Sequence, residues 1–160
     1  MAPDEPADRG SRRGYTAVLT ALLLLFCFRV GAQLLQTWSP VGFLPPFESW
    51  ESGALPYWLL VVSQAIIILV CAGLIWRLQT ARTMPSARTG IVLLVIGWCY
   101  FGLMCMRLII GLTVAPDHYW FSARLPTVFH LVLAGFLLVY GRFHMTAGRA
   151  IRSTSLGDTA

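Results

Sequence analysis

Long apolar runs alternate with short polar connections along this chain. Four runs are long enough to cross a bilayer, which takes about 20 apolar residues per helix. They cover residues 15–36, 56–78, 90–114 and 125–141, and the last is the shortest. They leave no room for a separate soluble domain. The pattern therefore predicts an all-α fold, an integral membrane four-helix bundle.

Both ends of the chain are polar. Residues 1–14 hold prolines and acids followed by arginines, and they predict a disordered basic tail before a four-helix domain over 15–143. Residues 144–160 form a second polar tail. The start of the first run also resembles a signal peptide, with basic residues before an apolar stretch over 17–28. Arg29 and the apolar residues after it argue against cleavage, and both readings stay open.

Composition supports a membrane location. The chain is 57% hydrophobic and 12% charged, whereas a soluble domain carries about 25% charged residues. All its basic residues are arginines, and most flank apolar runs, so the net charge of +5 indicates membrane topology and not nucleic-acid binding. The four cysteines lie inside apolar runs without a C-x-x-C pair, which disfavours disulfides and thiol redox chemistry.

Arginines gather at the middle connection and in the two polar tails, and their positions predict the orientation of the protein in the membrane. Positively charged connections stay in the cytoplasm. Both termini and the middle connection are therefore expected there, in the inner (plasma) membrane of a bacterium, while the other two connections face outward. The arginines of the middle connection and the C-terminal tail are Arg77, Arg82, Arg88, Arg142, Arg149 and Arg152.

The first outward connection, FLPPFESWESGALPY over residues 43–57, is unlike an ordinary solvated loop. Its prolines and Gly53 predict a short interfacial helix over 46–52. Phe47 and Trp50 would share one face of that helix and rest in the membrane interface. We expect this segment to form a lid, and the alternative is a plain aromatic-belt loop that sets the depth of its two helices.

Several polar side chains interrupt the outward halves of the apolar runs. Arg29, Gln33 and Gln36 form one stripe on the first helix. A charged side chain at mid-bilayer costs about 2.5 kcal/mol or more, so the two intramembrane arginines need partners. We predict a polar ligand pocket that opens outward. Its expected residues are Arg29, Gln33, Glu48, Glu51, Tyr57, Gln64, Arg107 and His130.

A structural role is the alternative for this cluster. Arg29 and Arg107 would then extend outward along their stems and pair with carboxylates of the connections, only holding helices together. As a ligand site, two cations and several amides suit an anionic or quinone-like head group.

The chain carries no sequence motif for a known reaction. It lacks a Gly-rich phosphate loop, G-x-S-x-G and H-E-x-x-H. His130 and His144 are separated by about 21 Å along one helix, so they cannot bind one haem iron together. No cofactor, metal or catalytic residue is predicted, although acid-base catalysis by Glu48, Glu51 or Asp117 with His130 stays open, as do a bound quinone or haem and a metal between His118 and His130.

Three architectural features resemble small bacterial four-helix membrane proteins of the DoxX-like kind. They are Arg29 within the first helix, Pro56 at the start of the second, and an inner connection that carries Arg82 and Arg88. The chain departs from that family in lacking a Gly-rich outer end of the first helix and in having Gln64 where an acid is expected. The resemblance implies a subunit of a quinone-linked oxidoreductase, or a member without an assigned role.

The sequence favours a non-enzymatic accessory or ligand-binding membrane protein and leaves an enzyme open. A quinone-linked oxidoreductase subunit is the alternative. A small transporter is a weaker one, because four helices without a repeat would have to dimerise to transport. The expected partners are the lipid bilayer and either a membrane protein or a second copy of the chain, and no nucleic acid.

Overall fold

Four α-helices make up the described part of the computed structural model, which covers residues 6–46, 50, 56–114, 118 and 123–157. They are α1 (Pro6–Trp38), α2 (Tyr57–Gln79), α3 (Ala87–Thr113) and α4 (Arg124–Gly157), and these residues form no strand. Each helix contains a stretch long and apolar enough to cross a membrane. The all-helical prediction with four membrane-spanning segments is thus confirmed, and the chain is a multi-pass membrane protein by this criterion.

The first and last helices of the chain are longer than the sequence predicts. α1 begins at Pro6, so residues 6–14 are helical where a disordered tail was expected, and α4 continues to Gly157 instead of ending near residue 141. The apolar pattern marks where lipid contact ends, but a helix goes on until a residue breaks it. No proline follows Pro126 in α4, while a proline in the first turn suits the start of α1.

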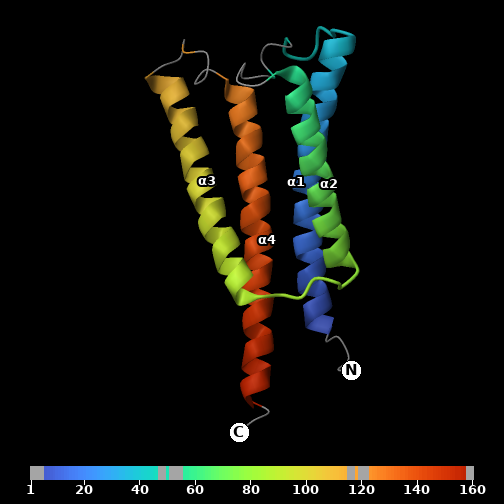
Figure 1. The fold of residues 1–160 in the computed structure, drawn as a ribbon, viewed down its shortest axis with the longest axis vertical. Helices are drawn as coiled ribbons and strands as arrows, with labels where there is room; N and C mark the ends of the chain where they lie inside the picture. Colours follow the sequence, from blue (N-terminus) through green and yellow to red (C-terminus); the bar gives the residue numbers. More distant parts are fainter. Residues whose placement is uncertain (1–5, 47–49, 51–55, 115–117, 119–122, 158–160) are drawn as a thin grey trace.

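The helices stand in the row α3, α4, α1, α2 (Figure 1). We call the end where α1 and α3 finish and α2 and α4 begin the upper end, and the end with residues 80–86 the lower end, as in Figure 1. Among the described residues, backbone packing joins α3 to α4, α4 to α1 and α1 to α2, but never α2 to α3. The bundle is therefore open along one side.

α3 and α4 approach closely because small residues recur every seven positions on both helices. A Cβ atom on Gly90 would lie 2.5 Å from the backbone nitrogen of Met145, and one on Gly148 would lie 2.5 Å from that of Ala87. Small residues let helices pack backbone to backbone in a membrane, and a seven-residue repeat predicts a left-handed crossing. The seam glycines are Gly90 and Gly97 on α3, and Gly141 and Gly148 on α4.

Two apolar clusters hold the row together. The larger lies toward the lower end and joins α1, α2 and α4 through Leu19, Leu78 and Phe136. The smaller lies at the upper end, where Trp50 packs between Ala32 of α1 and Phe129 of α4. The buried polar residues of α1 are next to this second cluster.

The predicted interfacial helix over 46–52 falls mostly outside the described residues, and the described part of the connection contains no helix. Trp50 is buried inside the upper end and its indole donates to the Pro45 carbonyl at 2.9 Å. We expected this ring in the membrane interface, but it packs inside the bundle with Ala32 and Phe129 instead. The Gln36 side chain anchors the start of the connection, because it accepts a hydrogen bond from the Val41 amide at 2.9 Å.

Candidate ligand site in the upper half of the bundle

Arg29 is the charged centre of the upper half. Its side chain is only 5% exposed. One terminal nitrogen donates to the Trp50 carbonyl at 2.9 Å, and the guanidinium carbon lies 5.5 Å from the centroid of the Phe129 ring. The carbonyl and the ring face each offset part of the charge, since both are electron-rich groups facing a cation. The connection between α1 and α2 therefore contributes a main-chain oxygen to the site.

Gln33 and Gln64 form a hydrogen bond between α1 and α2. The Gln64 amide nitrogen donates to the Gln33 side-chain oxygen at 3.1 Å, and both residues are buried. The second polar atom of each side-chain amide, Nε2 of Gln33 and Oε1 of Gln64, has no hydrogen-bond partner among the described residues. A buried polar atom without a partner costs about 1–3 kcal/mol, so this pair is incompletely satisfied.

His130 links this cluster to α3. Its Nδ1 atom and the Tyr100 hydroxyl are 2.6 Å apart, a short hydrogen bond between α4 and α3. The Tyr100 hydroxyl therefore sets the position of the imidazole.

A cavity of about 150 Å³ lies between α1, α2 and α4 beside these residues. Arg29, Gln64 and His130 supply its polar wall. Its volume is below the 300–1,000 Å³ usual for drug-sized ligands, and a cavity of about this size can hold one benzene ring. The other lining residues are Phe26, Leu60, Ser63, Ile67, Pro126, Phe129 and Leu133.

The structure brings together some of the predicted site residues and not others. Arg29, Gln64 and His130 line one cavity, and Gln33 is hydrogen-bonded behind Gln64. Arg107 is buried on α3 and does not line the cavity. Tyr57 lies nearer the upper end, where its hydroxyl is 3.0 Å from that of Thr37.

Glu48 and Glu51 lie outside the described residues, as does Asp117, so the expected pairing of the arginines with these carboxylates stays a prediction. Three features of the site are not evident from the sequence: the Trp50 carbonyl, the Phe129 ring and the Tyr100–His130 bond. Tyr100 lies seven residues before Arg107 and is therefore expected on the same face of α3, but its bond to His130 depends on how α3 and α4 pack.

The arrangement can bind and orient a small polar group. Arg29 and His130 offer nitrogen donors, and Gln64 offers a free carbonyl oxygen. Within the described residues, no three His, Cys, Asp or Glu side chains come together as a metal site would need.

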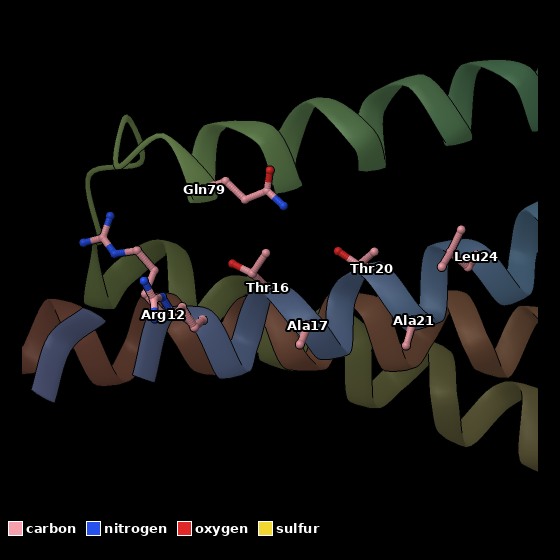
Figure 2. A pocket seen from close by; sticks show the side chains of 8 residues that line it. Arg12, Thr16, Ala17, Thr20, Ala21, Leu24 and Gln79 are labelled. Atoms are coloured by element: carbon pink, nitrogen blue, oxygen red, sulfur yellow. The ribbon is translucent and has the colours of Figure 1, made fainter. Parts of the chain in front are cut away.

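Two larger cavities lie toward the lower end. Figure 2 shows one of them, where Gln79 of α2 faces Thr16 and Thr20 of α1 across an open groove with Arg12 at its mouth. This groove measures about 570 Å³. The second lies between α2, α3 and α4, on the inner side of residues 80–86, and measures about 660 Å³. Neither contains any predicted site residue.

Comparisons of the chain with protein-family models, with curated proteins and with solved structures gave no match.

Proposed function

We propose that this protein is a small inner-membrane protein of a bacterium that binds a small polar ligand in the cavity between α1, α2 and α4. One observation carries the proposal. Nε of Arg29 and Oε1 of Gln64 are a buried donor and a buried acceptor without partners among the described residues, and both side chains line the same cavity. A ligand that bonds to both would remove an energetic cost that the protein bears when empty.

The ligand chemistry follows from these groups. A guanidinium favours an anion or a carbonyl oxygen, and the Gln64 oxygen favours a hydroxyl or amine on the same ligand. The volume of about 150 Å³ limits the buried part to about one aromatic ring. The best-fitting class is therefore a small ring-bearing acid or a quinone-like head group. The protein acts as an accessory to a membrane partner or to a second copy of itself, and catalyses no reaction.

The orientation is part of the proposal. Arginines dominate the lower end, where Arg77, Arg82 and Arg88 surround the connection between α2 and α3. The positive-inside rule then puts the lower end in the cytoplasm. The cavity beside Arg29 would receive its ligand from the outer side of the membrane.

A subunit of a quinone-linked oxidoreductase is the second candidate, in line with the resemblance to DoxX-like proteins. Its specific support is the Tyr100–His130 hydrogen bond of 2.6 Å beside a cavity of ring size. A phenol and an imidazole in contact can pass a proton to a quinone oxygen, provided that the quinone occupies the cavity.

Thermal stability of the purified protein in detergent tests ligand binding. We expect benzoate or a short-chain benzoquinone to raise the melting temperature, as any ligand does that binds only the folded state. The Arg29→Gln variant should lose this rise, whereas Leu23→Ala, a change in the lower apolar cluster, should keep it. A protein that neither probe stabilises, or an Arg29→Gln variant that responds like the wild type, would contradict the proposal.

The two candidates differ in what purified protein contains and does. An accessory protein should show no flavin absorbance and should not change the redox state of a quinone or quinol, whether bound or added. Bound quinone that is reduced through a co-purifying dehydrogenase would favour the oxidoreductase subunit. Absorbance spectra before and after adding an electron donor separate these outcomes.

A further inference from the structure

The cavity of about 660 Å³ between α2 and α3 is a second site, at the opposite end of the molecule from Arg29. It exists because α2 packs on α1 and α3 packs on α4, while residues 80–86 span the space between these pairs (Figure 1). Its polar wall holds Arg77, Arg82 and His144. Its apolar wall holds Leu74, Leu93, Phe136 and Leu137.

His144 supplies a buried hydrogen-bond donor to this cavity. The residue is 6% exposed, and its Nδ1 atom accepts a hydrogen bond from the Ser86 amide at 3.3 Å. A neutral imidazole that accepts through Nδ1 carries its proton on Nε2. Among the described residues, Nε2 is buried without a partner. His144 lines the cavity, and its side chain thus brings one buried N–H group that needs an acceptor next to it.

Two arginines add positive charge beside this donor. The end of α2 is a Schellman motif, in which the Arg82 amide donates to the Arg77 carbonyl at 3.0 Å and the Ala81 amide donates to that of Leu78 at 3.3 Å. Ala81 accordingly has a φ of 54°. This turn holds the Arg82 guanidinium 5.1 Å from the Trp76 ring centroid. The backbone geometry therefore fixes the position of one cation at the cavity.

Nothing in the elements around the cavity neutralises these cations. The sequence has no Asp or Glu between Glu51 and Asp117, or between Asp117 and Asp158, so α2, α3, α4 and residues 80–86 contain no acid. Two guanidinium groups with a neutral N–H donor match a phosphate group, which offers several acceptor oxygens. The apolar wall lies directly beside them and matches hydrocarbon, not water.

We propose that this cavity binds an anionic phospholipid of the surrounding bilayer. The phosphate contacts Arg77, Arg82 and Nε2 of His144, and the acyl chains lie in the opening between α2 and α3. Basic pockets between membrane helices are suited to such head groups. The lipid would fill the one side of the helix row that the protein leaves open, and so link the two helix pairs.

The test compares lipids added to the full-length purified protein after delipidation in mild detergent. Native mass spectrometry should retain dioleoyl phosphatidylglycerol on the protein and not dioleoyl phosphatidylcholine, and only the former should raise the melting temperature. Inorganic phosphate should give no comparable rise. Equal retention of both lipids, or an equal effect of phosphate alone, would overturn the proposal.

Variants with the same loss of charge test the location. Arg77 and Arg82 are exposed, so the Arg77→Gln/Arg82→Gln double variant should fold. It should bind the anionic lipid at least about tenfold more weakly, since it loses two charge-assisted contacts to the phosphate. The control is Arg13→Gln/Arg88→Gln, whose two arginines are exposed at the lower end and lie outside this cavity. Equal weakening in both double variants would show general charge attraction and contradict a site.

Discussion

Several polar side chains in the upper half of this protein have partners outside their own helix. Arg29 uses a carbonyl of the α1–α2 connection, Gln33 uses Gln64 of α2, and His130 uses Tyr100 of α3. A helix in lipid cannot turn such groups toward water, so each must find another segment of the chain or a ligand. The upper half of the protein therefore depends on specific side-chain pairs, unlike the lower half with its apolar cluster.

Substitutions in the Gln33–Gln64 pair test whether these two residues only join the helices or also serve a ligand. Gln64→Leu or Gln33→Leu alone should lower the free energy of unfolding by about 1–2 kcal/mol, because the remaining amide is left buried without its partner. The Gln33→Leu/Gln64→Leu double variant should regain most of that loss. Unfolding in mixed micelles measures all three.

The same double variant then reports on function. If the pair serves the ligand, the double variant folds but no longer responds to benzoate or to the quinone probe. A double variant with normal ligand response would show that the pair only joins α1 to α2.

At the scale of elements, the α3–α4 seam is the tightest packing in the described structure. Its glycines meet backbone atoms of the other helix, whereas Gly102, also in α3, has no atom within 4 Å of where a Cβ would stand. Glycine is unfavourable inside a helix by about 1 kcal/mol relative to alanine. The close approach of α3 and α4 therefore explains why position 90 is a glycine, but it does not explain the glycine at position 102.

Alanine substitutions at these two glycines test the seam. Gly90→Ala should destabilise the protein by about 1–3 kcal/mol, because its Cβ would lie 2.5 Å from the Met145 nitrogen and the helices would have to separate. Gly102→Ala should be neutral or slightly stabilising. The measurement is unfolding in mixed micelles, and equal effects of both substitutions would be inconsistent with the seam.

For the whole molecule, exposed tryptophans mark two levels along α2. Trp58 is 67% and Trp76 is 55% exposed. They are separated by about 27 Å at 1.5 Å per residue, which is close to the ~30 Å hydrocarbon thickness of a bilayer. Indole rings favour the membrane interfaces. The two levels therefore place residues 80–86 at one surface and the α1–α2 connection at the other.

Accessibility of introduced cysteines tests the orientation. All four native cysteines, Cys27, Cys71, Cys99 and Cys105, are free thiols and would first be replaced by alanine. Ser39→Cys at the upper end and Thr80→Cys at the lower end are both exposed positions. A membrane-impermeant maleimide should label the first in intact cells and the second only after lysis. The reverse pattern would put the Arg29 cavity on the cytoplasmic side.

The sequence alone determined the four helices and the concentration of polar residues in one half of them. Both depend on local properties, namely the length of apolar runs and the depth at which a polar residue interrupts one. The middle helices α2 and α3 were predicted to within a few residues, because turn residues bound them on both sides. The lower ends of α1 and α4 were not predicted, because the apolar pattern stops at the membrane surface whereas the helices continue beyond it.

Only the tertiary structure decided which polar groups meet. The row α3, α4, α1, α2 puts Arg29, Gln64 and His130 around one cavity, and it leaves α2 and α3 apart beside His144. Neighbour choice and the rotation of each helix depend on contacts summed along whole helix faces, such as the glycine seam. No short stretch of sequence contains all of these contacts. The volume of the cavity beside Arg29, and the open side between α2 and α3 that forms the other cavity, are therefore set only when the helices pack.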